Sequence, residues 1–210
     1  MKAVIFDFDG VLVESEPLLI DIEIEVLNQH GIPLTVEIAS EYLGLKLVDY
    51  IAALNERFEV NLDVDLIAKN ISTRNIALYE ETVPLVTHAY EILEAVSATH
   101  RLVLATSRER DLAIAAMERL NISQFFSKGV FKEDVVKGKP DPEVFLKAAT
   151  LVEVEPGECI VVEDAQNGFK AAKAAGMQVI ARKAEHNEQQ DFSLADYVVE
   201  DLREIESVIH

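Results

Sequence analysis

Asp7 and Asp9 are separated by one residue and precede Gly10, at the end of an apolar run that starts at Ala3. In an extended chain, alternate residues point to the same side, and glycine permits the tight turn that such a pair requires. The two carboxylates are therefore candidates for metal binding. An aspartate-rich turn after a strand is common, however, so this pair alone does not identify a site.

A second acidic pair, Glu163 and Asp164, follows another apolar run and comes directly before a predicted helix. The carboxyl ends of parallel strands meet at one edge of a sheet, so we expect Asp7, Asp9 and Asp164 to converge there. Converging carboxylates repel one another, and a hard divalent cation with oxygen ligands relieves that repulsion. The sequence thus predicts a Mg²⁺ site at this edge.

Groups suited to phosphate are expected at the same edge. Thr106 and Ser107 end a third apolar run and offer hydroxyls and backbone N–H groups, and Lys139 offers a cation. Taken singly, Thr106 or Ser107 is more simply a helix N-cap, and Lys139 a solvated loop charge. Their occurrence together with the acidic pairs favours a site for a phosphoryl group.

Short apolar runs predict the strands that position these residues, and amphipathic segments between most of the runs predict helices. The strands are predicted at 3–8, 102–105, 129–131, 159–162, 179–181 and 197–199. The helices are predicted at 89–96, 112–120, 143–151, 168–175 and 202–209. This alternation predicts an α/β fold with a Rossmann-like, doubly wound parallel sheet and right-handed crossovers.

The segment 14–80 has helical periodicity and no convincing strand, which predicts an inserted helical cap domain between core segments 1–13 and 81–210. Pro17 fits the first turn of one helix, which Gly31 ends, and Asp63 is a candidate N-cap for a later helix. The segment holds four basic and 13 acidic residues, a net charge of −9.

Four motifs in order resemble those of the haloacid dehalogenase-like superfamily, and the resemblance covers nearly the whole chain. The motifs are Asp7-Phe8-Asp9-Gly10-Val11-Leu12, Leu104-Ala105-Thr106-Ser107, Lys139-Pro140-Asp141-Pro142 and Glu163-Asp164-Ala165-Gln166-Asn167-Gly168. Within the superfamily, the chain is similar to the phosphoglycolate phosphatase and β-phosphoglucomutase-like branch.

This resemblance implies a Mg²⁺-dependent phosphatase for a small phosphorylated metabolite. Asp7 would form an aspartyl-phosphate, and Asp9 would protonate the leaving alcohol and then activate water. Asp7, the backbone carbonyl of Asp9, and Asp164 would hold Mg²⁺. Thr106 and Lys139 would bind the phosphoryl oxygens, while Glu163 would orient Lys139.

The resemblance also places two cap residues over the substrate. Lys46 and Arg74 are basic residues in a strongly acidic segment, so we expect one or both to contact the substrate. Arg108, two residues after Thr106, is a further candidate for substrate binding, although a surface arginine at the start of a helix explains it equally well.

Three other functions stay open. A phosphomutase of the β-phosphoglucomutase kind typically has a histidine and an arginine where this chain has Leu19 and Leu47, although Ser15 and Arg74 do fit that pattern. A dehalogenase does not need Asp9. A non-catalytic binding or regulatory protein would not need the complete set of motifs.

Composition excludes several classes of protein. The chain has 210 residues, 50% of them hydrophobic, and a net charge of −19, which argues against nucleic-acid and anionic membrane partners. The single cysteine, Cys159, permits no disulfide within the chain, so a reducing cytoplasm is expected. The histidines are scattered without metal-ligand spacing or placement at a strand end, and we predict no catalytic role for His30, His88, His100, His186 or His210.

Overall fold

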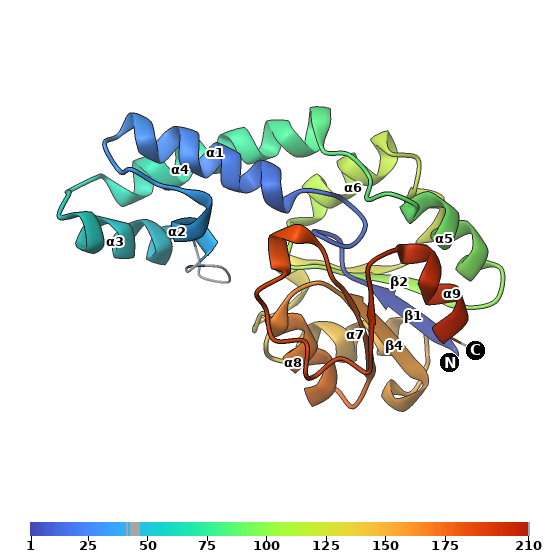
Figure 1. The fold of residues 1–210 in the computed structure, drawn as a ribbon. Helices are drawn as coiled ribbons and strands as arrows, with labels where there is room; N and C mark the ends of the chain where they lie inside the picture. Colours follow the sequence, from blue (N-terminus) through green and yellow to red (C-terminus); the bar gives the residue numbers. More distant parts are fainter. Residues whose placement is uncertain (41, 43–46, 210) are drawn as a thin grey trace. The chain divides into compact units, whose positions relative to one another are not determined.

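The computed structural model describes residues 1–40, 42 and 47–209, and in these residues the predicted strands form one parallel sheet. The sheet order is β3-β2-β1-β4-β5-β6. The neighbouring strands β2, β1 and β4 are labelled in Figure 1. β1 and β4 are buried along their whole length, as expected for central strands that are covered on both faces. The Rossmann-like fold predicted from the sequence is confirmed. The strands are β1 (Ala3–Phe6), β2 (Arg101–Ala105), β3 (Gly129–Val130), β4 (Cys159–Glu163), β5 (Gln178–Arg182) and β6 (Tyr197–Val199).

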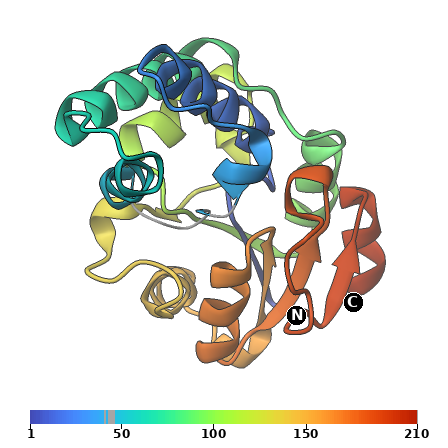
Figure 2. The same cartoon turned by 60° about the vertical axis from the view of Figure 1, so that its left-hand side comes forward.

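Helices cover both faces of this sheet. α7 and α8 lie on one face (Figure 2). On this face, Phe145 and Phe169 share a core with the strand residues Ile5 and Val161. α5 and α9 pack against each other on the opposite face (Figure 1). The predicted last helix is shorter than expected, because residues 202–204 form a 3₁₀ turn before α9. These helices are α5 (Ala89–Ser97), α6 (Arg110–Arg119), α7 (Glu143–Leu151), α8 (Gln166–Ala174) and α9 (Ile205–Val208).

The chain forms two compact units, Met1–Ser15 with Val83–His210, and Glu16–Thr82. The sequence predicts these two boundaries two residues earlier, after residues 13 and 80. Within the first unit, the segments on either side of the insertion are paired: the Glu14 amide donates to the Pro84 carbonyl, and the Val86 amide donates to the Leu12 carbonyl. The residues that flank the insertion are therefore held together by backbone hydrogen bonds of the first unit itself.

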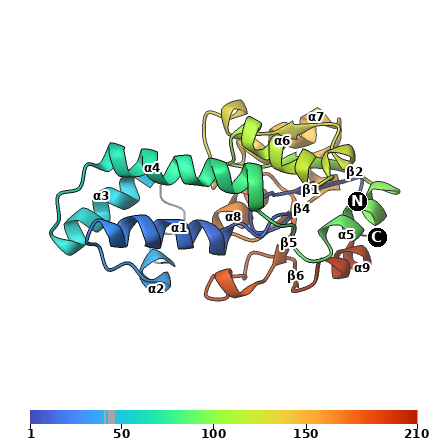
Figure 3. The ribbon, with the colours of Figure 1, turned by 90° about the horizontal axis from the view of Figure 1, so that it is seen from above.

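The second unit is helical, with α1 (Glu16–Gln29), α2 (Val36–Ser40), α3 (Leu47–Phe58) and α4 (Val64–Ala77). α1 and α4 run side by side (Figure 3), and their buried side chains form a separate apolar core with those of α3. Asp63 caps α4 as predicted, because its Oδ1 accepts a hydrogen bond of 3.1 Å from the Leu66 amide. None of the described helices combines the length and apolar character needed to cross a bilayer.

Candidate active site

The register of the sheet sets the motif residues at one level. Phe6 of β1 pairs with Leu104 of β2 on one side and with Val162 of β4 on the other. The residues that follow these three strands therefore leave the same edge of the sheet, at the carboxyl ends where parallel α/β sheets bind ligands. The Asp7 amide continues the pairing by donating to the Val162 carbonyl over 3.0 Å.

Lys139 lies between two of the carboxylates at this edge. Its Nζ is 2.9 Å from Asp7 Oδ1 and 2.6 Å from Glu163 Oε1. The second Glu163 oxygen, Oε2, accepts hydrogen bonds from the amides of Asp164 and Ala165, at 2.8 and 2.7 Å. Both oxygens of Glu163 are thus engaged, and this carboxylate holds Lys139 in place.

Burial controls the protonation of this group of side chains. Desolvation raises the pKa of Asp7 well above its usual range, although Lys139 acts in the opposite direction. Burial alone would lower the pKa of Lys139, but the carboxylates of Asp7 and Glu163 raise it overall. The ammonium therefore stays charged, while the Asp7 carboxylate is kept in a site that disfavours an uncompensated negative charge.

Asp164 is the third carboxylate of this cluster. Its Oδ2 is 2.8 Å from Nε2 of His186, and its backbone carbonyl accepts a hydrogen bond of 2.9 Å from Asn187 Nδ2. Burial raises the pKa of Asp164 to about 6, while the hydrogen bond from His186 acts to lower it. Asp164 is thus buried, and its neighbours come from the loop after β5.

Asp7, Glu163 and Asp164 offer oxygen atoms that lie within 4.8 Å of one another, a spacing that fits a single cation. Asp7 Oδ1 is buried and receives no hydrogen bond from any described residue; Lys139 lies close by but not in hydrogen-bond geometry. A buried oxygen without a hydrogen bond, in a cluster of hard carboxylate ligands, suits Mg²⁺. The donor set therefore fits the metal predicted from the sequence.

Gly10 forms part of the turn that follows Asp9 and lies against Asp164. Its φ is +67°, and a Cβ at this position would lie 2.0 Å from Asp164 Oδ2. Both the left-handed backbone and the close approach of Asp164 require glycine here. The turn is closed by hydrogen bonds from the amides of Leu12 and Val13 to the Phe8 carbonyl, at 2.9 and 3.0 Å.

Among the described residues, Ser15 and Arg108 hold the Asp9 side chain. Ser15 Oγ donates to Asp9 Oδ1 over 2.7 Å, and Arg108 Nε donates to Asp9 Oδ2 over 3.1 Å. Arg108 was predicted to bind substrate, and the structure pairs its guanidinium with this carboxylate. Its position beside Asp9 connects the loop after β2 with the loop after β1.

Of the two hydroxyl residues after β2, Thr106 is buried and Ser107 is exposed. Thr106 is 1% exposed, and its Oγ1 accepts a hydrogen bond of 3.0 Å from the Arg108 amide. This local turn holds the hydroxyl at the sheet edge instead of capping a helix, because α6 begins only at Arg110.

The two predicted cap residues have different outcomes. Arg74, on α4, forms an ion pair of 2.6 Å with Glu25 of α1, within the helical unit. Its side chain remains 36% exposed. Lys46 lies outside the described residues.

The histidine prediction is wrong in one respect. We expected no histidine at a strand end, but His186 lies in the 3₁₀ turn Glu185–Asn187, which follows the carboxyl end of β5, and contacts Asp164. A signal was available, because His186 comes five residues after the strand predicted at 179–181, in the loop that leaves the carboxyl end of that strand. Spacing to other histidines was the wrong criterion, since the partner is a carboxylate.

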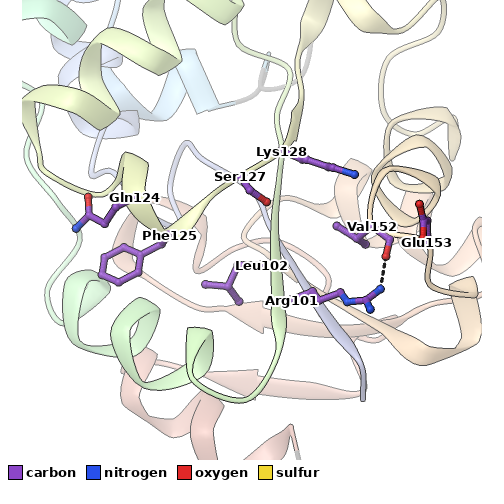
Figure 4. Close-up of a pocket in the computed structure, with 8 residues that line it drawn as sticks. All are labelled: Arg101, Leu102, Gln124, Phe125, Ser127, Lys128, Val152 and Glu153. Carbon is purple, nitrogen blue, oxygen red and sulfur yellow. Dashed lines mark hydrogen bonds between the residues drawn. The ribbon is translucent and has the colours of Figure 1, made fainter.

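A pocket of about 400 Å³ lies elsewhere, at the amino end of β2 (Figure 4). It is lined by Arg101 and Leu102 together with residues of the loops before β3 and after α7, and Arg101 Nη1 donates to the Val152 carbonyl over 2.5 Å. None of the motif residues lines it. It is therefore separate from the carboxylate cluster, at the opposite edge of the sheet.

Several known proteins are similar to this chain in sequence. The sequence profile of the haloacid dehalogenase-like hydrolase family matches residues 4–182. The phosphorylated carbohydrates phosphatase of Thermotoga maritima is 32% identical over 86% of this chain and 84% of its own. The fructose-1-phosphate phosphatase YqaB of Escherichia coli is 29% identical over 84% of this chain and 93% of its own.

A solved structure is similar to this chain in fold. The crystal structure of a protein provisionally assigned as a β-phosphoglucomutase, from Thermotoga maritima, has a TM-score of 0.81 and is 28% identical. The match covers 100% of each chain. It therefore includes the helical unit as well as the sheet.

Proposed function

The chain belongs to the haloacid dehalogenase-like hydrolase family as a phosphoric monoester hydrolase, and we propose that it is a Mg²⁺-dependent phosphatase acting through an aspartyl-phosphate on Asp7. The observation that carries the proposal is the meeting of Asp7, Glu163 and Asp164 within 4.8 Å, with Lys139 beside them. The substrate is a small phosphorylated metabolite, with sugar phosphates first, because two relatives are named for phosphorylated carbohydrates. A cytoplasmic location belongs to the proposal and rests on the single cysteine, Cys159.

Asp7 is the nucleophile. Its carboxylate attacks phosphorus, the bond from phosphorus to the leaving oxygen breaks, and the alcohol takes a proton from Asp9. Asp9 then removes a proton from the water that hydrolyses the aspartyl-phosphate. The hydrogen bonds from Ser15 and Arg108 support this role, because they fix the position of the Asp9 carboxylate.

Lys139 and Thr106 stabilise the charge on the transferring group. The Lys139 ammonium is already held beside Asp7 by Glu163, so it needs little reorganisation to bind a phosphoryl oxygen. The Thr106 hydroxyl and the backbone N–H of Ser107 bind further phosphoryl oxygens in this proposal. Asp7, Asp164 and the backbone carbonyl of Asp9 would hold Mg²⁺, which would offset the negative charge of the phosphoryl oxygens.

The helical unit acts as a cap that selects the substrate. Lys46 and Arg74 contribute to this selection, because a cation in so acidic a segment can offset the charge of a bound phosphate. Arg74 is exposed enough to exchange its Glu25 partner for a ligand, since exposed ion pairs contribute only about 0–1 kcal/mol to stability. Arg108, which pairs with Asp9, is a further residue proposed to bind the substrate.

Removal of the metal tests the proposal. We expect EDTA to abolish release of phosphate from p-nitrophenyl phosphate and sugar phosphates, and Mg²⁺ to restore it. Ca²⁺ should restore little activity, because its longer and more flexible coordination misplaces the nucleophile. Undiminished turnover in metal-free buffer would contradict the assignment of Asp7 and Asp164 as ligands.

The mutase remains a second candidate, because the Thermotoga maritima structure with that assignment matches the whole chain. Leu19 and Leu47 stand where the mutase pattern has its histidine and arginine, which favours water as the acceptor of the phosphoryl group. The same assays distinguish the two functions if each sugar phosphate is analysed both for free phosphate and for an isomerised product. An isomerised product without phosphate release would establish the mutase.

A further inference from the structure

The loop after β5 reaches the metal cluster through two neighbouring residues. His186 Nε2 is 2.8 Å from Asp164 Oδ2, and the two side chains are only 8% and 7% exposed. Asn187 donates 2.9 Å hydrogen bonds from Nδ2 to the backbone carbonyls of Asp164 and Arg182. The loop therefore contacts both the side chain and the backbone of Asp164.

The other side of this loop is tied to the turn after β1. Arg182 Nη1 donates to the Gly10 carbonyl over 2.5 Å, and Arg182 Nη2 donates to Glu14 Oε2 over 2.9 Å. The other Glu14 oxygen, Oε1, lies 3.6 Å from Nδ1 of His186. Glu14 thus stands between Arg182 and the imidazole and limits how the ring can rotate.

The Asp164 carboxylate is consequently confined on two sides. The backbone of Gly10 packs so close to Oδ2 that a Cβ there would lie 2.0 Å from it, and the imidazole of His186 contacts the same oxygen. Because a carboxylate oxygen can only accept, Nε2 of His186 must be the donor in this hydrogen bond. The hydrogen bond fixes the rotamer of Asp164 and leaves its other oxygen, Oδ1, for a ligand.

We propose that His186 is a positioning residue for the metal site, which orients Asp164 by a hydrogen bond from Nε2 and is itself steered by Glu14. The inference rests on the proposed function only for Asp164 as a Mg²⁺ ligand. It adds a residue outside the four motifs, supplied by the loop after β5. Groups that orient a metal ligand commonly contribute about 10- to 100-fold to metal affinity or activity when tested by substitution.

Calorimetric titration of the metal-free protein with MgCl₂ tests the proposal directly. We compare wild type with His186→Leu, which removes the donor, and with His186→Gln, whose amide can replace Nε2. His88→Leu is the matched control, because His88 also faces a carboxylate, Asp201 at 3.1 Å, away from the cluster. His186→Asn, too short to reach Asp164, replaces the leucine variant if the latter does not fold.

His186→Leu should weaken Mg²⁺ binding about 10-fold or more, and His186→Gln should regain most of the affinity. The Mg²⁺ concentration for half-maximal activity should rise by the same factor, while KM for p-nitrophenyl phosphate at saturating Mg²⁺ stays unchanged. His88→Leu should bind Mg²⁺ as wild type does.

Equal Mg²⁺ affinity in His186→Leu and wild type would overturn the inference and leave the phosphatase proposal standing. Equal loss in the leucine and glutamine variants would also overturn it, because the hydrogen bond would then not be the cause. A wild-type protein that binds no Mg²⁺ would refute the metal site of the proposed function, and the role of His186 with it.

Discussion

At the scale of single residues, the two aspartates of the first motif have different surroundings. Asp7 Oδ1 is buried without a hydrogen bond and faces Lys139, whereas both oxygens of Asp9 accept hydrogen bonds, from Ser15 and Arg108. The Asp7 oxygen without a hydrogen bond suits a metal ligand, whereas the Asp9 carboxylate is fixed in position at both of its oxygens. These different surroundings support the proposed division of roles, with Asp7 as the nucleophile and Asp9 as the acid and base.

This division predicts different losses on substitution. Asp7→Asn should abolish both turnover and trapping of beryllium fluoride, which mimics the aspartyl-phosphate. Asp9→Asn should slow turnover by about 10²- to 10⁴-fold, the usual contribution of acid-base catalysis, and still trap beryllium fluoride. Fluorine NMR of both variants with Mg²⁺ makes the comparison, and equal trapping would show that the roles are wrongly assigned.

Glu23, in α1 of the helical unit, gives a prediction for pH. Partial burial of its carboxyl raises its pKa to about 7 from 4.5, and the neighbouring Tyr50 hydroxyl acts in the opposite direction. The native state thus keeps a proton that the unfolded state releases between these pKa values, so stability falls as pH rises through them.

The free energy of unfolding should therefore decrease by about 2 kcal/mol more in wild type than in Glu23→Gln between roughly pH 5 and pH 8. Urea unfolding of both proteins across this range measures the difference. The buried Asp7 and Asp164 contribute equally to the stability curves of both proteins. The difference between the two curves therefore reports on Glu23 alone. Parallel curves would show that Glu23 ionises normally.

At the scale of elements, the start of α8 is where helix packing meets the site. Gly168 lies in the first turn of α8, and a Cβ there would be 1.9 Å from Glu163 Oε1, the oxygen that holds Lys139. Intrinsic propensity favours alanine over glycine in a helix by about 1 kcal/mol, but this contact opposes it. Glycine at position 168 therefore leaves room for the Glu163 side chain and does not stabilise the helix.

Gly168→Ala should displace Glu163 and lower kcat by about 10-fold or more, with little loss of helix content, since misplacing a catalytic group by an ångström is costly. Circular dichroism and steady-state kinetics separate the two effects. Gly157→Ala is the control, because a Cβ there meets no atom within 4 Å. Normal activity in Gly168→Ala would mean that Glu163 does not need its observed position.

At the scale of the whole molecule, the helical unit is an insertion into a unit that closes without it. Hydrogen bonds from Glu14 to Pro84 and from Val86 to Leu12 join the two flanking segments, and each unit has its own apolar core. The insertion also carries much of the negative charge that discourages anionic partners. The unit that contains the carboxylate cluster is thus closed by its own hydrogen bonds and its own core.

A chain in which a short glycine-serine linker replaces residues 16–82 should therefore fold and hydrolyse p-nitrophenyl phosphate, but lose preference among sugar phosphates. Arg74→Ala in the full chain should change that preference with little effect on stability, because its ion pair with Glu25 is exposed. Chemical denaturation and kinetics on a substrate panel test both. Unchanged preference in both proteins would place substrate selection in the loops of the sheet edge.

Local sequence patterns were sufficient for the strands, most helices, the Asp63 cap and the location of the motifs. The reason is that burial on both faces demands continuous apolar runs, and that chemistry-bearing residues follow them directly. Asp7 and Glu163 come to one level because β1 and β4 are parallel neighbours, which the alternation of strands and helices already favours.

Other features of the site depend on how distant segments meet. The pairing of Arg108 with Asp9, and the contact of His186 with Asp164, join residues that are 99 and 22 positions apart. No local periodicity encodes such pairs, because they follow from the path of two loops beyond the sheet and from the space that Gly10 leaves beside Asp164. The motifs could thus be read along the chain, whereas the support of the metal ligand arises from packing in three dimensions.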